Sequence, residues 1–202
     1  IVDTIRRKKL FPFVDMAYQG FASGDLDRDA FATRLIAKEL PNMALAQSFA
    51  KNFGLYGKRV GGVHFVCQDA SETERVLSQM KILIRPMYSS PPIAGARIVD
   101  GILSDSELTA LWKTELKGMA DRMNGIRKRL VQELASIGSQ RDWSHITSQI
   151  GMMAFTGLSK DQVTRLKEEF HVYMTDDGRA AISGLNTGNV QYVAKAFHDV
   201  TK

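Results

Sequence analysis

Residues 47–61 read QSFAKNFGLYGKRVG and indicate how the first part of this chain is built. A short apolar segment ends in Ser48, and Lys51 follows it. Glycines at positions 54, 57 and 61 let the backbone approach a ligand closely. A lysine held where a strand meets a glycine-rich loop is placed for covalent work on a carbonyl compound. Ser48 and Arg59 bracket it with a hydroxyl and a fixed positive charge, which suits a phosphate group. The alternative is a solvated surface lysine beside an ordinary turn.

A second segment upstream, FPFVDMAYQGF at residues 11–21, has the same design. Its apolar run ends in Asp15, and Tyr18 follows three residues later. Both segments therefore predict a buried strand that delivers polar groups at its carboxyl end, and ligands of α/β proteins bind at that edge of the sheet. An aspartate facing a ring nitrogen and a lysine amine are the two protein groups that pyridoxal phosphate chemistry requires.

Five segments of the chain resemble aspartate aminotransferases, which are fold-type I enzymes dependent on pyridoxal phosphate. They are FPFVDMAYQGFASGDLDRDA (11–30), QSFAKNFGLYGKRVG (47–61), QMKILIRPMYSSPPIAGARIV (79–99), WSHITSQIGMMAFTGLS (143–159) and HVYMTDDGRAAISGL (171–185). The segments occur in the order of that family and at its spacing, from near Phe11 to the last residues. The resemblance is therefore far more specific than a single motif.

The resemblance implies a role for each polar residue of the first two segments. Lys51 is similar to the catalytic lysine that holds the cofactor covalently and then acts as the general base. Asp15 is similar to the partner of the cofactor's ring nitrogen, and Tyr18 to the hydroxyl that bonds its phenolic oxygen. Ser48 and Arg59 resemble the ligands of its phosphate.

Two further arginines resemble the substrate-binding residues of the family. Arg179 resembles the arginine that binds the substrate's α-carboxylate. Arg85 resembles the arginine that binds the substrate's side-chain carboxylate, and in the family this arginine reaches from one subunit of a homodimer into the active site of the other. The chain departs from the family pattern at Ser90, Met153 and Asp177. Acidic residues just before Arg179 would weaken its field if they faced it.

The resemblance implies transamination between L-aspartate and 2-oxoglutarate, giving oxaloacetate and L-glutamate. The alternatives are an aromatic or broad-specificity aminotransferase and a catalytically inert fragment. The chain begins at Ile1, and the family's amino-terminal arm, stacking aromatic residue and glycine-containing phosphate loop are expected to precede it. We therefore expect a carboxy-terminal portion of a longer enzyme, whose activity needs the amino-terminal part.

The composition is that of an ordinary soluble globular protein, with 44% hydrophobic and 24% charged residues among 202. The formal net charge is +5, and basic clusters lie at residues 6–9 and 127–129. We interpret both clusters as solvated helix faces, because no nucleic-acid motif or interleaved aromatic residue accompanies them. Cys67 is the only cysteine, no histidine pair has metal-ligand spacing, and no segment has membrane-spanning length. We expect no metal, nucleic-acid or membrane partner, and a cytoplasmic or organellar-matrix enzyme.

The hydrophobic pattern predicts an α/β fold with two domains. Alternating strands and helices indicate part of a mostly parallel sheet in a cofactor-binding large domain, residues 1–103. A long interdomain helix and a small α+β domain are expected over residues 104–202. The strands are predicted at 11–15, 43–49, 63–67, 150–155 and 172–174, and the helices at 25–40, 71–80, 107–137, 159–170 and 186–200.

Overall fold

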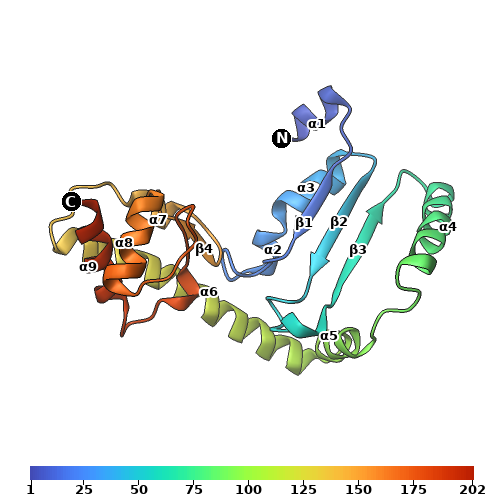
Figure 1. Ribbon diagram of the computed structural model, residues 1–202. Helices are drawn as coiled ribbons and strands as arrows, with labels where there is room; N and C mark the ends of the chain where they lie inside the picture. The colour runs from blue at the N-terminus through green and yellow to red at the C-terminus, as the bar shows by residue number, and fades with distance from the viewer. The chain divides into compact units, whose positions relative to one another are not determined.

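The computed structural model describes residues 1–202, which form two compact units. The first unit contains residues 1–20 and 25–115, and the second contains residues 21–24 and 116–202. One long helix, α6 (Ser106–Ser136), contributes residues to both units (Figure 1). The predicted domain boundary after residue 103 remains a proposal. None of the helices combines the length and apolar character needed to cross a membrane.

The sheet of the first unit contains β1 (Phe13–Met16), β2 (Met43–Ser48) and β3 (Gly61–Val66), which lie side by side in that order (Figure 1). β1 and β2 are parallel, whereas β2 and β3 are antiparallel. The α/β class is confirmed, and the part of the sheet that this chain provides contains one parallel and one antiparallel strand pair. Residues 49–60 connect β2 to β3 with only a 3₁₀ turn (Tyr56–Lys58) and no crossover helix, so the chain returns in the opposite direction.

The helices of the first unit begin and end at different residues from those predicted. The helix expected over 25–40 is divided at Ala30, and α4 is capped by Asp69, whose side chain accepts a bond from the Glu72 amide. α4 also continues past residue 80, where the predicted helix ends, and through Pro86, and α5 begins two residues after Pro92. The helices of this unit are α1 (Val2–Lys8), α2 (Leu26–Asp29), α3 (Phe31–Glu39), α4 (Ala70–Met87) and α5 (Ala94–Ser104).

The second unit contains most of the buried apolar side chains. Many of them come from α6, from α8 and from α9, and they include Leu130, Leu134, Leu166 and Phe197. A capping box on Ser159 starts α8 as predicted. The elements after α6 are α7 (Ser144–Ser148), β4 (Met153–Phe155), α8 (Lys160–Phe170), β5 (Arg179–Ala181), a 3₁₀ turn (Ile182–Gly184) and α9 (Val190–Thr201).

One predicted strand of the second unit is wrong. Residues 172–174 are not in a strand, and the partner of β4 is instead β5, which pairs with it antiparallel. The apolar side chains at 172–174 line a cavity of about 340 Å³ that α9 also lines. Their apolar character therefore reflects contact with that cavity rather than a place in the sheet.

Arg127 is buried, contrary to the expectation of a solvated basic cluster at residues 127–129. Its side chain is 1% exposed, and burial lowers the pKa of the guanidinium. The guanidinium donates to three carbonyl oxygens, those of Ile146 at 2.9 Å, Gly151 at 2.8 Å and Met153 at 2.6 Å. Arg127 thus ties α6 to the segment that leads into β4.

Candidate active site

The parallel pairing of β1 and β2 brings two of the predicted site residues to one edge of the sheet. Asp15 is opposite Ala46 in the register, and Ser48 is the last residue of β2. Parallel strands present their carboxyl ends at the same edge, so both polar side chains lie where ligands of α/β sheets bind.

Arg59 reaches the same place because the chain turns back sharply after β2. Gly61 is opposite Ser48, and the Phe49 amide donates to the carbonyl of Val60 at 3.1 Å. A Cβ atom on Gly61 would lie 2.5 Å from the Gln47 carbonyl oxygen, so only glycine allows this close return. Arg59, just before, has left-handed backbone angles with φ 50°.

A hollow of about 240 Å³ lies between these residues. Asp15, Ser48 and Arg59 all line it, together with residues 46, 47, 50, 60 and 61. Arg59 forms no ion pair in the structure, and its only hydrogen bond goes from Nη1 to the Tyr56 carbonyl at 3.1 Å. The hollow therefore combines a carboxylate, a hydroxyl and a guanidinium whose charge no acidic side chain neutralises, which suits a ligand that carries an anionic group.

Lys51 and Tyr18 form a pair beside this hollow. Ala50, which precedes Lys51, lines the hollow, and its amide donates to Ser48 Oγ at 3.2 Å. The Lys51 amine lies 5.1 Å from the centroid of the Tyr18 ring, a cation–π contact. The structure thus brings Asp15, Ser48 and Arg59 around one hollow and places Lys51 against Tyr18.

The backbone around Lys51 is held by residues that the sequence did not single out. Asn52 is 3% exposed, and its side-chain amide donates to the Gln19 carbonyl at 3.3 Å. The Trp112 indole donates to the Asn52 carbonyl at 2.7 Å, and its ring stacks on Phe53 with centroids 4.3 Å apart. An asparagine next to the lysine in the quoted stretch was a possible signal, but its partners lie far away in the sequence.

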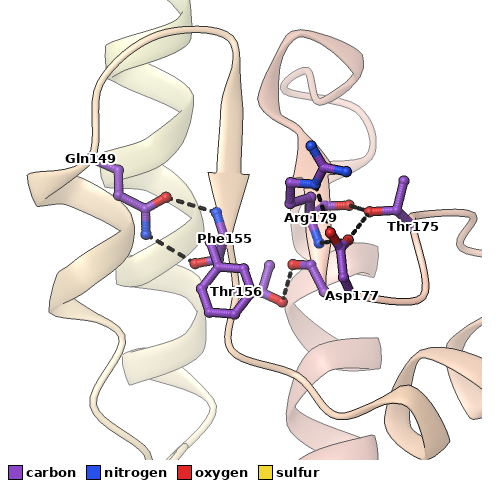
Figure 2. A network of polar contacts seen from close by, with 7 residues as sticks. Gln149, Phe155, Thr156, Thr175, Asp177 and Arg179 are labelled. Atoms are coloured by element: carbon purple, nitrogen blue, oxygen red, sulfur yellow. Dashed lines mark hydrogen bonds and ion pairs between the residues drawn. The ribbon is translucent and has the colours of Figure 1, made fainter.

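The second unit contains Arg179 at the start of β5. Figure 2 shows the Arg179 side chain beside Asp177, and Arg179 Nε donates to Asp177 Oδ2 at 2.9 Å. Of the acidic residues just before Arg179, Asp177 does face its guanidinium, so the condition under which they would weaken its field is met at this residue. A hydrogen bond from the Thr175 hydroxyl, and then the Arg179 amide and charge, lower the pKa of the Asp177 carboxyl.

The turn before Arg179 is fixed by Gly178 and Thr156. Gly178 has φ +84°, and a Cβ there would lie 2.8 Å from the Leu158 carbonyl oxygen. The Gly178 carbonyl accepts from the Thr156 amide at 2.9 Å and from its hydroxyl at 2.8 Å. Since Thr156 is buried, these two hydrogen bonds to one carbonyl fix the position of the backbone from which β5 starts at Arg179.

Arg85 lies near the end of α4 and is exposed. It forms no ion pair, and its hydrogen bond goes from Nη1 to Ser89 Oγ at 3.2 Å. The structure does not place Arg85 among the residues that line the hollow beside β2.

The chain belongs to the aminotransferase class I and II family, whose description matches residues 1–197. Its sequence is 52% identical to the mitochondrial aspartate aminotransferase of Dictyostelium discoideum, over 100% of this chain and 47% of that protein. The chain spans about half the length of the curated relatives it matches.

Two solved structures show that the fold is that of aminotransferases. A mitochondrial aspartate aminotransferase from Trypanosoma brucei is 57% identical, with a TM-score of 0.97 over 100% of this chain and 53% of that one. An aromatic-amino-acid aminotransferase from Burkholderia pseudomallei, covalently bound to pyridoxal phosphate, is 43% identical. Its TM-score is 0.97, over 100% of this chain and 50% of that one.

Proposed function

We propose that this chain provides the cofactor-binding lysine of a pyridoxal-phosphate-dependent aspartate aminotransferase. The enzyme exchanges an amino group between L-aspartate and 2-oxoglutarate, giving oxaloacetate and L-glutamate. The observation that carries the proposal is the hollow lined by Asp15, Ser48 and Arg59 with Lys51 and Tyr18 beside it.

The residues of this hollow fit the cofactor. Arg59 and Ser48 supply a guanidinium and a hydroxyl for its phosphate, and Asp15 supplies a carboxylate for its ring nitrogen. The Lys51 amine lies within cation–π distance of Tyr18, whose hydroxyl is proposed to bond the phenolic oxygen. When bound, pyridoxal phosphate supplies an electron-withdrawing ring that accepts the electron pair left by cleavage of the bond to the α-hydrogen.

The chain's own residues then have distinct tasks. Asp15 holds a proton on the ring nitrogen, which maintains the ring's electron-withdrawing power. A free Lys51 amine would take the proton from the substrate's α-carbon as general base. Arg179 binds the α-carboxylate and Arg85 the side-chain carboxylate, and fixing both ends orients the bond to be broken.

We propose that Arg85 acts in the active site of a neighbouring subunit, so that the working unit is a homodimer. Its guanidinium is exposed and has no acidic partner in this chain, which supports a carboxylate partner from elsewhere. Large apolar side chains on α4 are also exposed, among them Leu77 at 53% and Ile82 at 61%, which supports an interface nearby. Several relatives are mitochondrial enzymes, which supports the organellar matrix as the compartment.

An aromatic or broad-specificity aminotransferase is the second candidate, because solved enzymes of both descriptions also match the chain. Arg85 and the higher identity to aspartate aminotransferases favour aspartate. The test compares kcat/KM for aspartate and phenylalanine in the complete protein and in Arg85→Leu. We expect aspartate to be preferred and Arg85→Leu to lose at least about one to two orders of magnitude toward aspartate alone.

Equal loss toward both substrates would contradict the role of Arg85. A preference of the unmodified protein for phenylalanine would favour the second candidate. Absence of activity with any amino acid, in a protein that binds the cofactor, would indicate an inert member of the family.

A further inference from the structure

The Asp177 carboxylate is anchored within the turn before it contacts the guanidinium of Arg179. Its Oδ1 accepts from the Thr175 hydroxyl at 2.5 Å and from the Arg179 backbone amide at 3.3 Å. Its Oδ2 accepts from Arg179 Nε at 2.9 Å (Figure 2). Two donors of the turn therefore fix one oxygen, and the other oxygen is presented to the Arg179 side chain.

This contact uses one edge of the guanidinium and leaves the other free. The terminal nitrogens Nη1 and Nη2 of Arg179 make no hydrogen bond in the structure, and the side chain is 59% exposed. Two parallel N–H donors on the terminal nitrogens match the two oxygens of a carboxylate. We propose that Asp177 is a positioning residue, which holds Arg179 by Nε so that its terminal nitrogens are ordered for a substrate carboxylate. The inference rests on the proposed carboxylate-binding role of Arg179.

The physical reason is the conformational freedom of a long side chain. Binding immobilises a rotamer-rich side chain such as arginine, and this loss weakens affinity unless the side chain is ordered beforehand. The Asp177 charge acts in the opposite sense, because it repels a second carboxylate. Asp177 is 55% exposed, so water and salt screen that repulsion, whereas the hydrogen bond to Nε orders the guanidinium directly. We therefore expect the ordering to outweigh the repulsion.

The experiment uses the complete, cofactor-loaded protein and three variants, Asp177→Ala, Asp177→Asn and Asp176→Ala. Asp176→Ala is the matched control, since it removes the same charge one residue earlier. The Asp176 carboxylate pairs with the Lys160 amine at 3.6 Å rather than with Arg179. The measurements are KM and kcat for aspartate and the Kd of succinate, a dicarboxylate that cannot donate an amino group. Exchange of the Arg179 Nε proton is followed by NMR without any substrate.

Asp177→Ala should raise both KM and Kd by roughly tenfold and leave kcat within about twofold, because a binding group loses its order while the reacting groups keep theirs. Its Nε proton should exchange faster. Asp177→Asn should restore most of the affinity, since an amide oxygen still accepts from Nε, and Asp176→Ala should match the unmodified protein.

An unchanged or lower Kd in Asp177→Ala would overturn the inference, and so would an Asn variant as weak as the Ala variant. A fourth variant, Arg179→Ala, distinguishes the positioning role of Asp177 from the carboxylate-binding role of Arg179. If it weakens succinate binding while Asp177→Ala does not, only the positioning role fails. If it leaves succinate binding unchanged, the carboxylate-binding role of Arg179 fails as well.

Discussion

Replacing Arg127 by methionine should destabilise the second unit, because three backbone carbonyls lose their donor. Methionine keeps an unbranched apolar stem in the buried channel but cannot hydrogen-bond to the carbonyls of residues 146, 151 and 153. An unpaired buried carbonyl costs about 1–3 kcal/mol. Ile146 is fully buried and should bear that whole penalty, whereas Gly151 and Met153 are partly exposed and can bind water.

Removing a buried guanidinium also removes the cost of its desolvation, which offsets part of the loss. The expected net change in the free energy of unfolding is therefore about 1–3 kcal/mol. The most local assay is native-state hydrogen exchange at the two amides that flank the β4–β5 pair, those of Thr156 and Ile182. Their protection should fall by roughly one to two orders of magnitude, since 1.4 kcal/mol is a factor of ten.

Lys128→Met is the matched control, because it removes a positive charge from the neighbouring, exposed position of α6. It should leave protection nearly unchanged, as surface substitutions usually do. If Arg127→Met lost no more protection at Thr156 and Ile182 than Lys128→Met, the bonds of Arg127 would not hold β4 in place.

Two further predictions concern the turns that carry the candidate site residues. Gly61→Ala should lower the affinity for pyridoxal phosphate, because the new Cβ would lie 2.5 Å from the Gln47 carbonyl oxygen and would displace the strand end that lines the hollow. An affinity equal to that of the unmodified protein would show that the hollow tolerates the shift. The carboxyl of Asp177 should titrate below its ordinary pKa of 3.8, and Thr175→Val should raise that pKa, because the hydrogen bond from the threonine hydroxyl is the largest single cause of the shift. Since the folded-state pKa is depressed, the stability of this turn is present above pH 3.8 and lost as the pH falls through the folded value; an NMR titration midpoint at or above 3.8 would contradict this.

The grouping of Asp15, Ser48 and Arg59 could be predicted from the sequence, because each residue stands at a strand end or in a glycine-containing return. The direction of β3 was harder to predict. Apolar periodicity identifies a strand but does not give its orientation, which here follows from a connection without a crossover helix.

Other features depend on partners that are distant in the sequence. Arg127 looked like part of a solvated basic face, because its acceptors are carbonyls of an irregular segment with no pattern of their own. The pairing of β5 depends on the positive φ of Gly178 and on its bond to Thr156, and neither is visible in the short sequence Arg179-Ala-Ala. On α6, Met123 is buried, whereas Leu111, an apolar residue of the same helix, is 55% exposed. Periodicity indicates which face is apolar and does not say where that face has a partner.

The most direct test of the central claim is to find which lysine holds the cofactor. The complete protein is loaded with pyridoxal phosphate, reduced with borohydride and digested, and the modified peptide is identified by mass spectrometry. Lys51 directly follows Ala50, which lines the hollow, and its amine lies against the Tyr18 ring, whereas Lys58 in the same loop is exposed. We expect the pyridoxyl group on Lys51 and no specific label in Lys51→Ala, whereas Lys58→Ala should be labelled normally. A label that stays in Lys51→Ala, or that is found on Lys58 in the unmodified protein, would contradict this expectation.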